Sequence, residues 1–348
     1  MNLKNIVFAK VAVSRLTLAL LVTFAFLGAF IIYKRFRYGF LGYEILHALR
    51  VNYQRLPASS YILKKPPVEV KAYLDQLNEN GIVKISNIID VQDLAQLQND
   101  FNSMIKYIDE HAKDVCDKGD GFTEDYFDRT ENFYCSSNPL KYSTRLAALS
   151  CDPKILGIIN HYLQGDAHIN FVSAARILSG GDKHGLGSYQ WHHDAWGKKL
   201  HVMFLLTDVG EGDQYMTYVV GSHKVQHSLD KFMHSRLTYE YAKSQMKQVN
   251  IFKCMGKAGD IFIFDPNAVH SGNRTNGADR DTFIVSYTRD RTYIWNLDIP
   301  KDVLAYNSGG YSNPYREIVA LKNQNPPQKL FPKIKCWDQG LTAVNLWI

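Results

Sequence analysis

The sequence predicts a mostly β protein with flanking helices and an N-terminal transmembrane helix. After His168, short apolar runs are separated by Gly, Asp and Asn, which is typical of an antiparallel sandwich or jelly roll. Several helical patterns precede these runs, so helices are expected on the outside of the sheets. The 21 Tyr and 18 Phe of the 348-residue chain also suit a strand-rich core.

The membrane helix is predicted from residues 16–33, which carry no charge. As a helix this run would extend roughly 27 Å, close to the hydrocarbon thickness of a bilayer. A cleaved signal peptide is the alternative, but three basic residues within 34–37 occupy the place of a small-residue cleavage site. We therefore expect a single-pass membrane protein anchored by residues 1–37, with the body of the chain on the cytoplasmic side.

Charge and cysteine usage exclude two classes of function. The formal net charge is +6, and six basic residues precede Glu44, the first acidic residue. The remaining chain is therefore neutral, so we expect no nucleic-acid partner. The five cysteines form no C-x-x-C pair, which argues against a disulfide framework and against a cysteine zinc site.

Composition and periodicity divide the chain into four parts. These are an anchor (1–37), a juxtamembrane linker (38–67), a catalytic domain (68–300) and an irregular tail (301–348). Within the catalytic domain, apolar residues at helical spacing predict helices over 68–80, 91 to about 111, and 153–163. Short apolar runs predict strands over 82–85, 169–178, 200–206, 215–220, 261–264 and 282–288.

The densest chemistry lies in the segment Ser188-Tyr-Gln-Trp-His-His-Asp-Ala-Trp196. In a strand, side chains two apart point to the same side, so His192 and Asp194 would converge while His193 faces away. One imidazole and one carboxylate are two thirds of the facial triad that holds iron(II) with positions left open. The spacing alone is weak evidence, because about one H-x-D match is expected by chance.

Residues further along the chain complete the candidate site. The segment Asp265-Pro-Asn-Ala-Val-His270 delivers a second histidine at the start of an expected strand. Ten residues later comes Arg280, whose planar guanidinium matches a carboxylate such as the distal one of 2-oxoglutarate. Thr282 would point the same way and could add a hydroxyl donor.

Over residues 70–290 this arrangement resembles the phytanoyl-CoA dioxygenase family. The resemblance rests on Gly81-Ile-Val, Trp191-His-His-Asp, Val220-Gly-Ser-His-Lys224, Gly259-Asp260, His270 and Arg280, in this order. It implies a double-stranded β-helix (cupin-like jelly roll), with iron bound by His192, Asp194 and His270 and the co-substrate held by Arg280. Val220 replaces the usual proline before Gly-Ser-His, and the N-terminal anchor is foreign to the family, so its acyl-CoA substrate is not carried over.

The resemblance implies Fe(II), with 2-oxoglutarate and O2 as co-substrates and ascorbate as a candidate reductant. The expected reaction is hydroxylation of a small-molecule substrate, and the membrane anchor makes a lipid or lipid-linked molecule a candidate. Desaturation or cyclisation on the same iron is an alternative outcome. A jelly roll that binds without catalysis and a hydrolytic zinc site are the rival interpretations, although no iron ligand is missing and Arg280 has no role in a zinc hydrolase.

Two further histidines have ordinary structural explanations. We expect His193 to be solvent-facing or hydrogen-bonded in the core rather than a ligand. His223 is expected to be a turn residue that bonds to backbone.

Overall fold

The computed structural model describes residues 65–319 of the chain, together with Thr23 and Phe24. Gaps within that range fall at 117–126, 130–132, 137–138, 180–190, 195–198, 226–238, 245, 247, 274, 290–298 and 317.

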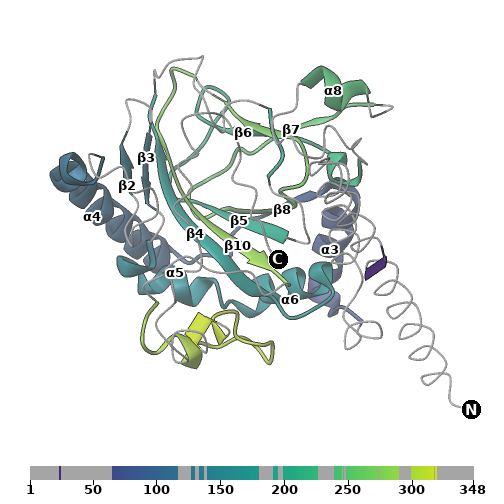
Figure 1. Ribbon diagram of the computed structural model, residues 1–348, viewed down its shortest axis with the longest axis horizontal. Helices are drawn as coiled ribbons and strands as arrows, with labels where there is room; N and C mark the ends of the chain where they lie inside the picture. The colour runs from purple at the N-terminus through teal and green to yellow at the C-terminus, as the bar shows by residue number, and fades with distance from the viewer. Residues whose placement is uncertain are drawn as a thin grey trace, which may run out of the picture.

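Two antiparallel sheets form the centre of the molecule (Figure 1). The larger has seven described strands in the order β1-β8-β5-β10-β4-β3-β2, and the smaller has three in the order β7-β6-β9. The larger comprises β1 (Ile82–Ile85), β2 (Phe127–Arg129), β3 (Phe133–Ser136), β4 (His168–Ile177), β5 (Lys199–Leu205), β8 (Ile261–Phe264) and β10 (Arg280–Thr288). The smaller comprises β6 (Met216–Val219), β7 (Ile251–Lys253) and β9 (His270–Gly272).

Helices cover the outer face of the larger sheet, as Figure 1 shows. They are α3 (Val68–Asn80), α4 (Val91–Cys116), α5 (Thr144–Leu149) and α6 (Pro153–Leu163). The sequence sets their ends: the Asp152 side chain accepts hydrogen bonds from the first turn of α6, and Gly81 ends α3 in a left-handed conformation. A short helix, α8 (Tyr239–Ser244), lies apart from this layer, near the smaller sheet.

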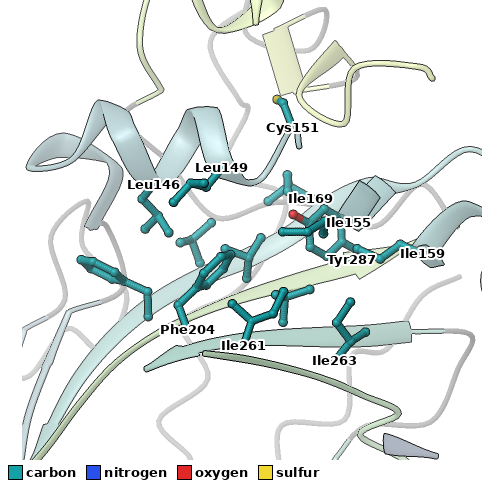
Figure 2. Close-up of a cluster of buried hydrophobic side chains, with 14 of the residues drawn as sticks. Leu146, Leu149, Cys151, Ile155, Ile159, Ile169, Phe204, Ile261, Ile263 and Tyr287 are labelled. Carbon is teal, nitrogen blue, oxygen red and sulfur yellow. The ribbon is translucent and has the colours of Figure 1, made fainter. Parts of the chain in front are cut away.

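The main core lies between these helices and the larger sheet. Figure 2 shows its centre, where Leu146 and Leu149 of α5 and Ile155 of α6 face Phe204 and Ile263 from the sheet. A second apolar cluster lies on the other face of the sheet and includes Met203, Leu205 and Phe262. Both faces of β5 and β8 are therefore buried, which explains why these strands read as continuous apolar runs.

Strand β10 shows how this two-sided burial places functional side chains. Phe283, Val285 and Tyr287 join the helix-side core. Because neighbouring side chains on a strand point to opposite faces, Arg280 and Thr282 lie on the face directed at the smaller sheet. The sequence thus positions polar groups inside the molecule by alternation alone.

The described part of the C-terminal region packs on the helix side. Val303, Tyr315 and Ile318 belong to the main core. The Tyr315 and Ser150 hydroxyls are 2.6 Å apart, and Tyr287 donates to the Ser150 carbonyl at 2.8 Å. Residues beyond position 300 therefore contribute to the fold as far as they are described.

The mostly β architecture with outer helices is confirmed and is consistent with a cupin-like fold. The expected single-pass membrane localisation is contradicted. No helix among the described residues is long and apolar enough to cross a membrane. Apart from Thr23 and Phe24, residues 16–33 lie outside the described residues. A sufficiently long uncharged run is compatible with a membrane span, but it does not by itself establish that the segment crosses a membrane.

We expect Gly81→Ala to destabilise the protein by about 2–4 kcal/mol. Gly81 has φ +80°, where a side chain costs about 1 kcal/mol, and an added Cβ would also collide with the His223 ring and the Tyr218 hydroxyl. Gly310→Ala is the control, because Gly310 has φ +83° but open space around it. Urea unfolding of both variants measures the two costs, and equal losses would contradict the predicted collision.

Candidate metal centre

A reciprocal pair of backbone hydrogen bonds brings the two candidate ligand segments together. The His192 N–H donates to the His270 carbonyl at 2.9 Å, and the His270 N–H donates to the His192 carbonyl at 2.8 Å. The Asp194 N–H then donates to the Pro266 carbonyl at 2.8 Å. The segment 191–194 is therefore fastened along the connection between β8 and β9.

His192, Asp194 and His270 form a compact cluster of donor atoms. Each offers one ligand atom, and these atoms lie within 4.8 Å of one another. Nε2 of His192 is 3.7 Å from Oδ1 of Asp194, and Nε2 of His270 is 3.9 Å from Oδ2. The imidazoles are buried, whereas 36% of the Asp194 side chain is exposed, so the cluster is accessible from one side. Two imidazoles and one carboxylate are the donor set that suits iron(II).

The expectation that these residues lie in a strand was wrong in detail. His192 and His270 form an isolated bridge, and positions 193 and 194 have no regular secondary structure. The ligands converge because the bridge and the Asp194–Pro266 bond fix the backbone, rather than through alternation along a strand. His193 is buried, and its Nδ1 lies 2.6 Å from the Asp194 carbonyl, which matches the core-bonded alternative.

The tautomer of the neutral His270 ring is set by its backbone neighbour. Its Nδ1 lies 2.8 Å from the Ala268 carbonyl, an acceptor, so this nitrogen carries the proton. The lone pair is then on Nε2, the atom that faces Asp194. This contact therefore directs the Nε2 lone pair into the cluster.

A network around Asp265 supports the turn that precedes His270. Its carboxylate accepts from the Tyr162 hydroxyl at 2.7 Å and from the backbone and side-chain nitrogens of Asn267 at 2.8 and 2.6 Å. The Tyr218 hydroxyl donates to the Asp265 carbonyl at 3.0 Å. Sequence reasoning missed this network, because neither tyrosine lies near Asp265 in the chain. His223, by contrast, contacts the Asn78 carbonyl at 3.3 Å, as a turn residue was expected to do.

Sequence reasoning also missed a third imidazole beside the cluster. Nδ1 of His201, on β5, is 3.6 Å from Oδ2 of Asp194. The His201 ring is buried between the rings of Phe171 and Phe264, which meet it edge-on at centroid distances of 5.2 and 5.3 Å. The available signal was a single histidine in the otherwise apolar β5 run Leu200–Leu205.

The surroundings of Asp194 and His201 give these two side chains different charges. The partial loss of water around the carboxylate would raise the pKa of Asp194, but the surrounding imidazoles of His270, His201 and His192 lower it to about 2. Burial lowers the pKa of His201 to about 4, against the opposing effect of the Asp194 charge. At neutral pH the site therefore holds one carboxylate anion beside a neutral His201 ring.

Arg280 and Thr282 lie where alternation predicted, on the inner face of β10. Both are buried. Burial raises the pKa of the Cys254 thiol well above its usual range, and the Arg280 charge opposes that rise, which places the guanidinium near this inner residue. The Thr282 hydroxyl has a long contact of 3.4 Å with the Ala175 carbonyl, so its donor is directed at the backbone.

The model of the family described as Phytanoyl-CoA dioxygenase (PhyH) matches residues 77–282, more than half of the chain. The chain belongs to the phytanoyl-CoA dioxygenase family. Family membership supports a dioxygenase-type function for this protein. The matched range includes His192, Asp194, His270, Arg280 and Thr282.

Two solved structures of EctD show the same fold at low sequence identity. EctD from S. alaskensis with bound Fe has a TM-score of 0.53 at 13% identity, over 74% of this chain and 92% of that one. EctD with 2-oxoglutarate and 5-hydroxyectoine has a TM-score of 0.52 at 15% identity, over 75% and 93%. The epimerase SnoN from nogalamycin biosynthesis matches with a TM-score of 0.46 at 16% identity, over 71% and 93%. No curated protein matches the chain by sequence.

Without metal, we expect the stability of the protein to fall as the pH drops from about 6.5 to about 4. In this window the unfolded chain binds a proton at His201, whereas the folded protein, with its pKa lowered to about 4, does not. This stabilisation of the folded state is complete above the pKa of His201 in the unfolded chain. It is lost as the pH falls to the pKa of His201 in the folded protein, and the total loss is roughly 3 kcal/mol.

Urea unfolding of the metal-free protein across this pH range measures the loss. His201→Phe removes the titrating group, so its stability should change less over the same window. An unchanged pH dependence in that variant would assign the loss to other groups.

Proposed function

We propose that the protein is an Fe(II)- and 2-oxoglutarate-dependent dioxygenase that hydroxylates a C–H bond of a small-molecule substrate. The observation that carries the proposal is the convergence of His192, Asp194 and His270 on one partly open cluster within a family of dioxygenases. Fe bound to one EctD structure and 2-oxoglutarate bound to another support the choice of metal and co-substrate. O2 would be the second co-substrate.

Each site residue has a distinct role in this proposal. His192 and His270 would donate lone pairs to the iron, and Asp194 would supply the single negative charge. Iron held in this way would couple the oxidative decarboxylation of 2-oxoglutarate to succinate with oxidation of the substrate. Arg280 would pair with the distal carboxylate of 2-oxoglutarate through its two parallel N–H groups. Thr282 would assist only after releasing the Ala175 carbonyl.

The carboxylate at position 194 favours hydroxylation over halogenation, because a halogenating relative would carry a small residue there to admit the halide. Desaturation and cyclisation use the same iron ligands and remain alternative outcomes for this site. We assign catalysis to the proposed domain 68–300. The suggestion of a lipid substrate depended on the membrane anchor and is not carried forward.

We expect His270→Ala to abolish iron binding and to reduce succinate formation to background. Two remaining ligands hold iron(II) poorly, and this variant also loses the imidazole that Ala268 orients. Anaerobic iron titration and a succinate assay on the full chain measure both effects. His223→Ala removes an imidazole outside the cluster and should retain both properties; full activity in His270→Ala would contradict the triad.

We expect Arg280→Lys to weaken 2-oxoglutarate binding by about 1–3 kcal/mol with iron affinity nearly unchanged, because lysine keeps the charge but lacks the planar fork. The matched control is Arg176→Lys on the neighbouring strand β4, where the guanidinium pairs with both carboxylate oxygens of Asp281. The control should lose stability without weakening 2-oxoglutarate binding. Equal 2-oxoglutarate affinities in the wild type and Arg280→Lys would move the anchoring role elsewhere.

A further inference from the structure

His201 is a polar residue in a position that otherwise holds apolar side chains. It shares the inner face of β5 with Met203 and Leu205, which belong to the apolar cluster between the sheets. Burying an imidazole there costs free energy unless its nitrogens find partners. The edge-on contacts with Phe171 and Phe264 fix the plane of the ring but satisfy neither nitrogen.

Its Nδ1 is directed at Asp194 rather than at the proposed metal. The metal cluster consists of His192, Asp194 and His270, and His201 is not a member. The Asp194 carboxylate has one oxygen, Oδ1, beside His192 and the other, Oδ2, beside both His270 and His201. A separation of 3.6 Å between Nδ1 and Oδ2 is just beyond hydrogen-bond length, so a small movement of the carboxylate closes it.

Strand β10 places a second polar side chain on the same face as the ring. Ser286 is paired directly with His201 in the sheet, so the two side chains lie on the same face. The Ser286 side chain is fully buried, and its hydroxyl has no hydrogen-bond partner among the described residues. The hydroxyl makes no bond to His201 in this structure. If it turned to donate to Nε2, the proton of the neutral ring would stay on Nδ1, the nitrogen that faces Asp194.

We propose that His201 is a positioning residue, which donates from Nδ1 to Oδ2 of Asp194 while accepting from the Ser286 hydroxyl. The inference rests on the proposed function. A carboxylate whose Oδ2 is held in this way would offer its other oxygen, Oδ1, to the metal. It would then occupy one coordination position rather than two and leave room for 2-oxoglutarate and O2. His201 acts through Asp194 and touches neither the metal nor the co-substrate.

Two substitutions in the full-length chain separate this role from packing. His201→Phe keeps an aromatic ring between Phe171 and Phe264 but has no donor. His201→Asn loses the ring but places an amide N–H close to the position of Nδ1. A role in positioning predicts that the asparagine variant retains more function, whereas a role in packing predicts the reverse.

The readout is anaerobic iron(II) binding, followed by the metal-to-ligand charge-transfer absorption when 2-oxoglutarate is added. We expect His201→Phe to lower the iron affinity roughly 10–100-fold and to shift this absorption. His201→Asn should stay closer to the wild type in both measurements. Ser286→Ala leaves the ring in place and should lower the iron affinity about fivefold. It is the substitute test if the phenylalanine variant does not fold.

The outcomes distinguish this inference from the proposed function. Wild-type affinity and absorption in His201→Phe, or in Ser286→Ala if the former is unfolded, overturn the positioning role alone. So does an asparagine variant that is as impaired as the phenylalanine variant, because the ring itself would then be what matters. A wild-type chain that binds no iron(II) overturns the proposed function, and the inference with it.

Discussion

The candidate site depends on the mutual backbone pairing of His192 and His270. These residues are far apart in the chain, and bringing them together requires the closure of a long loop, which costs conformational entropy. The bridge alone contributes two hydrogen bonds, too little to offset that cost. The two sheets supply the difference, because the pairing of β9 with β6 fixes His270 whether or not the segment 191–194 is bound.

The two faces of the larger sheet carry different kinds of side chain. Its outer face packs on helices α3, α4, α5 and α6 mainly through apolar side chains, which form the main core. Its inner face carries His201, Arg280, Thr282 and Ser286 among apolar neighbours. Buried polar groups of this kind weaken a fold unless a partner compensates them. Their concentration on one face places these polar groups on the side of the candidate metal centre, away from the main core.

Sequence reasoning found most elements because their periodicity is local. The helices over Val68–Asn80 and Pro153–Leu163 and the strand Ile261–Phe264 have the expected bounds, and the ligand cluster gathers the three predicted residues. His201 was not found because its relation to Asp194 depends on how β5 lies beside the connection to β9, and sheet register is not encoded locally. The membrane prediction failed for a related reason. It used only the length and the lack of charge of one segment, and these local properties do not show what surrounds that segment.

The site also shows preorganisation that the sequence could not indicate. The Ala268 carbonyl fixes the proton of His270 before any metal arrives, and the Pro266 carbonyl fixes the backbone of Asp194. Both carbonyls belong to the turn whose conformation the Asp265 carboxylate holds. If these residues bind iron as proposed, loosening the turn would displace two of the three proposed ligands at once. The turn after β8 would then belong to the proposed metal centre, although none of its own side chains is a member of the cluster.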